Sequence, residues 1–339
     1  MTESASEWTD VVARRLMARD MENETWEKGC AVNGLLSTEQ DEFVDYAQRL
    51  IDRAVATQSE AGVLNYDDPQ SYLSGDEPVR AQSEPSILGH GVLEFYDQTG
   101  DKMYLDAADA QYRYLMELAY RSEEGGISFG TSPIELWVGP MYMNCPFLSR
   151  YGQLTDTPEA IDEAVEQLEI HTKFLQDPHT GLFRHSWRET PNSFVDSSFW
   201  ARGNGWAVTG LVETLRYLPA DHPGRESIVS IFRELCSSIH ARQAKSGMWH
   251  NILDSKVSKL EASGTLQFIY AFNLGRELGI LKDESYDEAA EKAMNICKGL
   301  VDSEGNVRRV AVPPDKTAPL GVTSYGQGFF LLAATSMEK

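Results

Sequence analysis

The sequence predicts an all-α fold, an (α/α)6 barrel made of six helical hairpins. A Gly-led unit recurs along the chain at intervals of 55 to 66 residues, and such a period indicates one structural unit repeated side by side. Runs that are apolar on every side alternate with runs that are apolar on one face. Six runs of each kind imply two concentric rings, because a helix that is apolar all round must be covered all round.

The repeat unit is a small turn ending in Gly, followed by a short apolar or aromatic group. The glycines that mark it are Gly62, Gly126, Gly181, Gly247 and Gly305. After each comes a polar segment with aromatic residues, and then an apolar run. Because these segments lead into the apolar helices, they should gather at one end of the barrel. Function is concentrated in loops held by a rigid scaffold, so we expect the site at that end.

The two classes of helix follow from periodicity. The apolar runs, expected inside, are 26–36, 86–97, 140–151, 204–218, 264–278 and 325–335. The amphipathic runs, expected outside, are about 6–20, 40–57, 102–119, 158–175, 224–242 and 285–300. No linker or low-complexity tract interrupts them, so residues 1–339 are expected to form a single catalytic-type domain.

Composition excludes several classes of partner. The net charge of -22, from 30 basic and 52 acidic residues, argues against nucleic acid, whose phosphates would be repelled. No apolar run of membrane-spanning length and no secretory signal pattern occur, so we expect a cytoplasmic protein with no membrane partner. An acidic surface with more Arg than Lys would suit a salt-rich cytosol; the alternative is an ordinary acidic protein.

Neither a metal nor a cofactor is expected. The cysteines, Cys30, Cys145, Cys236 and Cys297, are scattered singly without a CxxC pair, and each is expected to be buried as a small hydrophobe. No His, Asp and Glu residues occur at a spacing typical of metal ligands.

The segment FWARGNGW places Trp200, Arg202, Asn204 and Trp206 at the start of an inner helix, where its two glycines would let the backbone bend closely. Indole faces stack on sugar rings, and a guanidinium pairs with a carboxylate through two hydrogen bonds. An acidic sugar would need both. The alternative is that the tryptophans are packing residues and Arg202 pairs with a neighbouring acid.

Other repeats bring further candidates to the same end. These are Trp26, Glu84, His90, Trp137, Tyr142, Asn144, His185, Trp187, Glu261, Tyr325 and Gln327. So many aromatic side chains at one rim favour a carbohydrate cleft over a core. Simpler roles remain open for some of them: His90 as a hydrogen-bonded structural residue, Glu261 as a helix cap, and Tyr325 and Gln327 as residues that close the barrel against the first repeat.

The motifs DPHTGLFRHSW, FWARGNGW, GMWHNILD, EASGT and YGQGFFLLA, in this order, resemble those of the unsaturated glycuronyl hydrolases. The resemblance is greatest to glycoside hydrolase family 105, the unsaturated rhamnogalacturonyl hydrolases, and family 88 is related. It runs from about Trp26 to Ala334, and FWARGNGW is its most specific part. The family has an (α/α)6 barrel, which agrees with the repeat.

The resemblance implies an activity on short acidic oligosaccharides that lyases leave capped by a sugar with a C4=C5 double bond. In the family, an aspartic acid protonates C4 of this vinyl ether and water adds at C5. The hemiketal then opens and releases the neighbouring sugar. Trp200, Arg202 and Trp206 match positions that line the unsaturated sugar, His185 matches a histidine of that pocket, and Trp26 falls near an aromatic position of its wall.

One position departs from the family pattern. The family's catalytic aspartate follows a tryptophan by two residues, and here Trp137 and Pro146 keep the spacing while the acid's position is Gly139. A second family aspartate, near the preceding inner helix, also has no clear match, and Glu84 or Ser86 falls at its place. Glycine donates no proton, so Glu84, Glu135 and His185 are the candidate replacements, with Glu84 favoured because burial would raise its pKa.

Three functions therefore remain open. The first is the hydrolase, with Glu84 and His185 as its catalytic residues. The second is a carbohydrate-binding or regulatory protein that kept the cleft without the acid. The third is another reaction on this barrel, such as that of a lyase or epimerase, with a Tyr or His base at the mouth.

Overall fold

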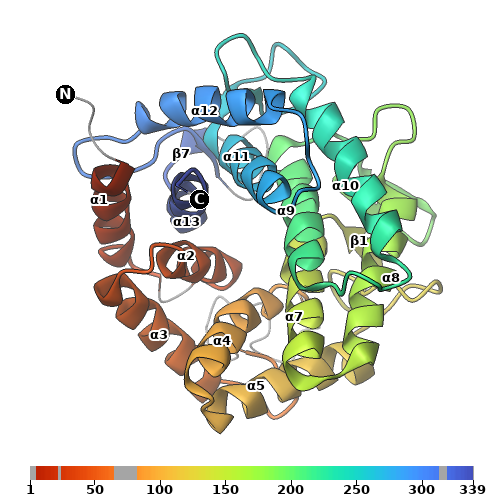
Figure 1. The fold of residues 1–339 in the computed structure, drawn as a ribbon. Coiled ribbons are helices and arrows are strands. Elements are labelled where there is room, and N and C mark those ends of the chain that lie inside the picture. The colour runs from red at the N-terminus through yellow and green to blue at the C-terminus, as the bar shows by residue number, and fades with distance from the viewer. Residues whose placement is uncertain (1–4, 22–23, 65–81, 313–318, 339) are drawn as a thin grey trace.

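The computed structural model describes residues 5–21, 24–64, 82–312 and 319–338, and within them the chain forms two concentric rings of helices (Figure 1). The inner ring consists of α2 (Trp26–Leu36), α4 (Ser86–Thr99), α6 (Pro140–Met143) with α7 (Cys145–Thr155), α9 (Ala201–Tyr217), α11 (Ala262–Glu277) and α13 (Ser324–Ser336). The outer ring consists of α1 (Ala5–Met17), α3 (Asp41–Ala56), α5 (Lys102–Arg113), α8 (Pro158–Leu175), α10 (Arg225–His240) and α12 (Ser285–Lys298).

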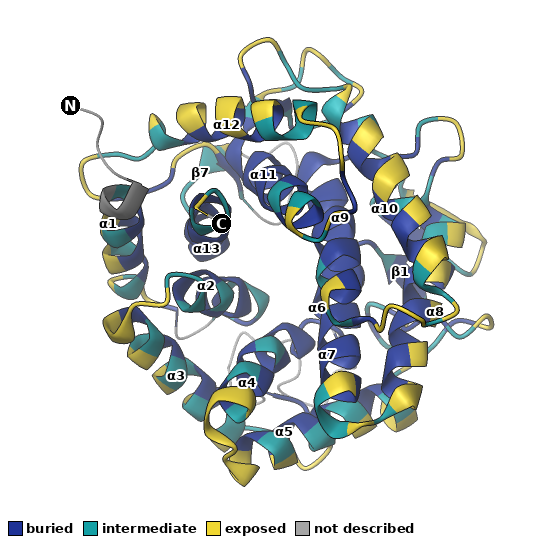
Figure 2. Cartoon of the chain, viewed as in Figure 1, coloured by how far each residue is buried: buried dark blue, intermediate teal, exposed yellow. Residues whose placement is uncertain are grey.

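The inner ring is closed. Each inner helix packs against the next along the chain, and α13 packs against α2, so that the last repeat meets the first. The inner helices are almost wholly buried, whereas the outer helices expose one face (Figure 2). The predicted (α/α)6 architecture is thereby confirmed.

Three helix boundaries differ from those predicted. The run expected at 140–151 is two helices separated at Asn144, close to Pro146, which lacks the N–H that a continuous helix would use. The run expected at 102–119 ends in a π-helical turn, η1 (Tyr114–Leu118). The helix expected to begin at residue 204 begins at Ala201, so Gly203 and Gly205 are helical and do not bend the chain.

Short antiparallel strands, which the sequence pattern did not indicate, follow the Gly-led turns. β1 (Glu135–Trp137), β2 (Ser186–Arg188) and β3 (Ser193–Asp196) form one sheet in that order, with Leu136 opposite Trp187. Two further pairs are β4 (Trp249–His250) with β5 (Leu260–Glu261), and β6 (Val310–Ala311) with β7 (Leu320–Gly321). These strands stiffen the loops that precede the inner helices.

The Gly-led turns use backbone that favours glycine. The φ angle is +93° at Gly62, +68° at Gly181, +104° at Gly247 and +84° at Gly305. In the second repeat the left-handed residue is Gly125, at +91°, and not the expected Gly126. A residue with a side chain rarely adopts this conformation, which explains the glycine at the same point of each repeat.

The four cysteines are buried and unpaired with one another, as predicted. In the described ranges, no helix has both the length and the apolar character needed to cross a bilayer. Within the same part of the chain, no three or more His, Cys, Asp and Glu side chains are grouped so as to hold a metal ion.

The seam between α2 and α13 depends on small residues. A Cβ on Gly34 would lie 2.4 Å from the carbonyl oxygen of Gly328, and a Cβ on Gly328 would lie 2.3 Å from that of Cys30. Real Cβ atoms do not approach backbone this closely, so the two helices can touch only where both lack a side chain. This contact closes the ring.

We therefore expect Gly328→Ala to lower the free energy of unfolding by about 1–3 kcal/mol, the usual effect of overpacking a rigid contact. Gly139→Ala is the matched control, because φ there is -57° and the new Cβ would meet only Met143 Cε, at 3.8 Å. Denaturant unfolding of the two variants measures the difference. Equal stabilities would contradict the role assigned to the seam.

Candidate active site

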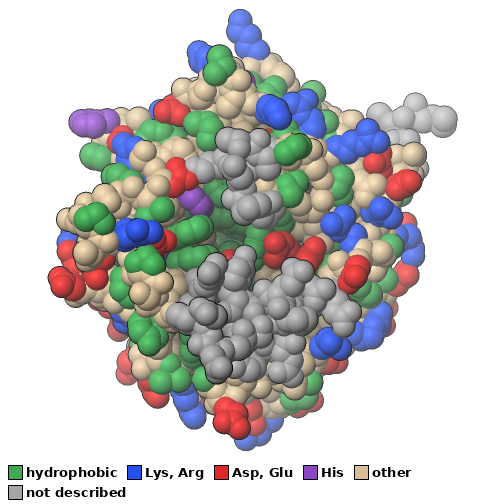
Figure 3. Space-filling view, turned by 180° about the vertical axis from the view of Figure 1, so that it is seen from behind, with side chains coloured by type: hydrophobic (Ala, Val, Ile, Leu, Met, Phe, Trp, Pro, Cys, Tyr) green, Lys and Arg blue, Asp and Glu red, His purple; other side chains and the backbone are tan. Residues whose placement is uncertain are grey.

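The end of the barrel at which the inner helices begin is hollowed. Figure 3 shows this face: hydrophobic side chains line the hollow, and acidic side chains and a histidine lie near its edge. We call this hollow the mouth. The residues discussed next lie at the first turns of inner helices or in the segments that lead into them.

Arg202, in the first turn of α9, is the central charge of the mouth. Its Nη1 donates hydrogen bonds to the carbonyl of Ala311, at 2.6 Å, and to the hydroxyl of Tyr325. The guanidinium carbon lies 4.1 Å from the ring centroid of Trp200, 4.8 Å from that of Tyr325 and 5.5 Å from that of Trp26. The side chain is thus fixed between three aromatic rings.

This guanidinium lacks a carboxylate counter-ion in the described part of the chain. Arg202 is only 4% exposed, and its Nε has no hydrogen-bond partner among the described residues. A buried charge without a counter-ion is costly, and a bound anion removes that cost. Among the described residues Arg202 forms no close ion pair with an acid, although its charge lowers the pKa of Glu27 and of Glu261 from a greater distance.

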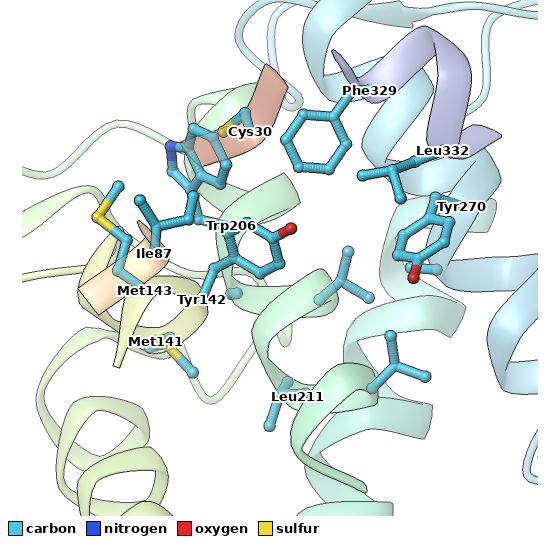
Figure 4. Close-up of a cluster of buried hydrophobic side chains, with 14 of the residues drawn as sticks. Cys30, Ile87, Met141, Tyr142, Met143, Trp206, Leu211, Tyr270, Phe329 and Leu332 are labelled. Carbon is cyan, nitrogen blue, oxygen red and sulfur yellow. The ribbon is translucent and has the colours of Figure 1, made fainter. Parts of the chain in front are cut away.

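Aromatic rings from four inner-ring elements continue the wall and floor. The ring of Trp26 meets that of Trp206 edge-on at 5.7 Å and lies 4.8 Å from that of Tyr325. Trp206 in turn stacks on Tyr142 at 5.6 Å. Figure 4 shows this lower layer, in which Trp206 and Tyr142 lie beside Cys30 and Met143. Tyr142 is only 2% exposed and lines the cavity at the opposite end of the barrel, so the structure gives no support to its predicted contact with substrate at the mouth.

His185 lies beside Trp200, whose ring also contacts Arg202. Its ring meets those of Trp137 and Trp200 nearly edge-on, both at 5.0 Å between centroids. Trp137 stacks on Phe129 at 4.1 Å. Five of the predicted residues, Trp26, Trp200, Arg202, Trp206 and Tyr325, therefore form one chain of contacts, and His185 and Trp137 extend it.

Glu135 is removed as a candidate acid. Arg188 Nη2 lies 2.6 Å from its Oε1, and the indole nitrogen of Trp137 donates to its Oε2 at 2.7 Å. Both carboxylate oxygens of Glu135 are thus bound to other side chains of the protein. The contact with Arg188 joins β1 to β2, and the contact with Trp137 fixes the orientation of its ring.

Two further carboxyls of the described chain lie near the starts of α2 and α4, and the sequence motifs indicate only one of them, Glu84. Glu84, just before α4, is 7% exposed; burial raises the pKa of its carboxyl well above the ordinary value, and the charge of Glu27 raises it further. Glu27 lies in the first turn of α2. Burial raises the pKa of Glu27 to about 7, the neighbouring Glu24 adds to that shift, and Arg202 opposes it.

The position that departs from the family pattern is open. Apart from its chain neighbours, the atom nearest to a Cβ on Gly139 would be Met143 Cε, at 3.8 Å. The adjacent backbone is bound to the site, because the Val138 amide donates to the carbonyl of His185 at 3.1 Å. Among the described residues, the Cβ of a side chain at position 139 would therefore have room, next to a backbone contact with His185.

Two predicted substrate-binding residues have structural roles instead. The ring of Trp187 packs on Phe174 at 4.2 Å, and its indole nitrogen donates to Asn192 at 2.9 Å. The Asn204 amide binds the backbone N–H and carbonyl of Phe183, at 2.8 and 2.9 Å, and the carbonyl of Trp200 at 3.0 Å. These side chains position the segments around the mouth.

The simpler roles left open for other residues are also observed. Glu261 caps α11 by accepting from the amides of Ser263 and Gly264, both at 2.6 Å. Gln327 accepts from the Val307 amide at 2.6 Å, which joins α13 to the last Gly-led turn. His90 lies 3.1 Å from the carbonyl of Met143 and is a hydrogen-bonded structural residue.

A cavity of about 490 Å³ opens at the opposite end, where the inner helices finish. Its two arginines are paired with carboxylates: Arg150 lies 2.7 Å from Glu94 and 3.2 Å from Asp97, and Arg216 lies 3.8 Å from Glu213. The mouth, with its uncompensated guanidinium, is the stronger candidate for the site.

Known proteins resemble this chain over different lengths. An unsaturated rhamnogalacturonyl hydrolase of Bacillus subtilis is 27% identical over 230 residues, which cover 66% of this chain and 65% of that protein. An unsaturated 3S-rhamnoglycuronyl hydrolase of Formosa agariphila is 28% identical over 60% of this chain and 57% of its own length. The chain thus spans less than two thirds of these relatives.

Solved structures share the fold over nearly the whole chain. A possible member of the GH105 family from Salmonella enterica has a TM-score of 0.84 at 20% identity, covering 99% of this chain and 94% of its own. The unsaturated glucuronyl hydrolase of Bacillus sp. GL1 has a TM-score of 0.78 at 16% identity, covering 100% and 97%.

The model of Glycosyl Hydrolase Family 88 matches residues 2–339. The resemblance seen in the sequence motifs is thereby confirmed, and the chain belongs to Glycosyl Hydrolase Family 88.

Proposed function

We propose that the protein hydrates the C4=C5 bond of unsaturated uronic acids that cap short oligosaccharides, and so releases the capping sugar. The observation that carries this proposal is the buried Arg202 guanidinium, which lacks a carboxylate partner among the described residues and lies between aromatic rings. An acidic sugar offers the carboxylate and the apolar ring face that such a site needs. The names of the Bacillus and Formosa relatives support the same substrate class.

In this proposal Arg202 holds the substrate carboxylate, and Trp26 and Trp206 contact the sugar ring. Glu84 is the proton donor to C4. Its burial raises the pKa of the carboxyl well above the ordinary value, which favours the protonated form that a general acid requires. His185, held between two tryptophan rings, binds a hydroxyl of the substrate near the open space at Gly139.

One observation favours a second function. Gly139 provides no carboxyl where the family resemblance implies the catalytic aspartate, so a protein that binds acidic sugars without turning them over would keep the same cleft. Arg202 and the aromatic rings serve both functions equally well. Only turnover separates the two.

We expect Glu84→Gln to lower kcat on a lyase-generated unsaturated disaccharide by about 100-fold or more, the usual contribution of a general acid. Loss of ultraviolet absorbance by the double bond measures turnover. The control is Glu277→Gln, which changes an inner-helix carboxyl at the opposite cavity. Binding by the wild type with no absorbance loss would favour the binding protein.

The open space at Gly139 allows a gain-of-function test. Because an added side chain fits there, Gly139→Asp should fold normally, and in the Glu84→Gln background it should restore measurable turnover. Gly139→Asn in the same background is the matched control, with similar volume and no ionisable proton. Equal rates for the two double variants would mean that this space does not adjoin the reacting carbon.

Arg202→Ala should weaken binding of the unsaturated disaccharide about tenfold or more, since hydrogen bonds between charged groups contribute about 1.5–3 kcal/mol each. A neutral disaccharide of the same size should lose much less. Calorimetric titration of both ligands gives the two ratios, and Arg202→Lys should lie between, because it keeps the charge without the planar fork. Equal weakening for the two ligands would contradict carboxylate binding by Arg202.

A further inference from the structure

We propose that the acid and the base of the reaction are separate carboxyls on adjacent inner helices, with Glu84 as the acid and Glu27 as the base. This inference rests on the proposed hydration reaction. It assigns a catalytic role to Glu27, a residue that neither the sequence motifs nor the family pattern indicates.

The fold brings the two carboxyls to one side of the mouth. Glu27 directly follows Trp26, whose ring contacts Trp206, Tyr325 and the Arg202 guanidinium. Glu84 precedes α4, the inner helix that packs against α2.

The helices that carry these carboxyls approach closely just below them. A Cβ on Gly29 would lie 2.3 Å from Ile87 Cγ2. These residues are two positions beyond Glu27 and three beyond Glu84, so the close contact holds both carboxyls at the start of neighbouring helices.

The hydration can be divided between these groups without any other reactant than water. The Glu84 carboxyl gives its proton to C4, and the electron pair of the C4=C5 bond forms the new C4–H bond. The oxygen of a water molecule bonds to C5, and the proton that it loses passes to the Glu27 carboxylate. Exchange with solvent then returns a proton to Glu84 and removes one from Glu27. The net change is addition of one water to the double bond.

The surroundings of the two carboxyls favour a protonated Glu84 and an ionised Glu27. Burial raises the pKa of Glu27 to about 7, and that of Glu84 is raised well above the ordinary value by burial and by the charge of Glu27. Because the charge of Glu27 raises the pKa of Glu84, an ionised Glu27 favours a protonated Glu84. The other titratable or charged groups that interact with Glu27 are Glu24, Cys30, Arg202 and Tyr325.

The roles of Glu27 and Glu84 predict how kcat changes with pH. Loss of the base on protonation of Glu27 should lower kcat as the pH falls through about 7. Loss of the acid on ionisation of Glu84 should lower kcat again at higher pH. The wild type should therefore show a bell-shaped profile.

The test compares Glu27→Gln with Glu27→Asp and with the distant control Glu277→Gln. Glu27→Gln should lower kcat by about 100-fold or more and remove the fall on the acid side of the profile. Glu27→Asp keeps a carboxyl and should restore that fall together with part of the rate. Thermal unfolding of each variant shows whether it is folded. A Glu27→Gln profile that keeps its acid side would overturn the assignment of the base.

Infrared titration of the protonated carboxyl band gives a readout that does not need turnover. Glu27→Gln should lower the pKa of the Glu84 band, because it removes a neighbouring negative charge. Carboxyls that titrate independently in an active enzyme would overturn the pair and leave the proposed function intact. A folded wild type that binds the disaccharide without turnover would overturn the proposed function, and with it the roles of acid and base.

Discussion

The Arg202 guanidinium is the constraint on which the mouth depends. A buried cation without a carboxylate partner in the described chain must be stabilised by weaker contacts, and here these are aromatic faces and a backbone carbonyl. The contacts come from α2, from the segment before α9, from β6 and from α13. None of these contacts is an ion pair, which is consistent with the proposed binding of a substrate carboxylate by Arg202.

The contacts around Arg202 therefore depend on the same helix packing that closes the ring. Trp26 and Tyr325 belong to the first and last inner helices, and they meet over Arg202 only because the Gly34–Gly328 contact lets α2 and α13 touch. Gln327 and Glu261 affect the geometry of the mouth indirectly. Gln327 fixes the Gly-led turn before α13, and Glu261 fixes the first turn of α11. Side chains with no part in the chemistry thus determine the geometry of the mouth.

The fold and the convergence of the main candidate residues could be predicted because both follow from the repeat. Every repeat delivers its polar segment to the same end, so Trp26, Arg202 and Trp206 were expected to converge. Residue type alone does not give the direction of a side chain, which is why Trp187 and Asn204 were assigned to the mouth but pack elsewhere. Glu27 could not be identified as a candidate from the sequence, because an acidic residue in the first turn of a helix is common and is favoured by the helix dipole.

The radial geometry of the barrel also bears on the glycine at position 139. All inner helices begin at the same end of the barrel, so carboxyls carried by α2, by the segment before α4 and by α6 would lie around the same mouth (Figure 1). Under the proposed function, a proton donor could therefore come from a neighbouring repeat instead of from position 139. The raised pKa values of Glu27 and Glu84 and the room for a Cβ at Gly139 fit such a change of position.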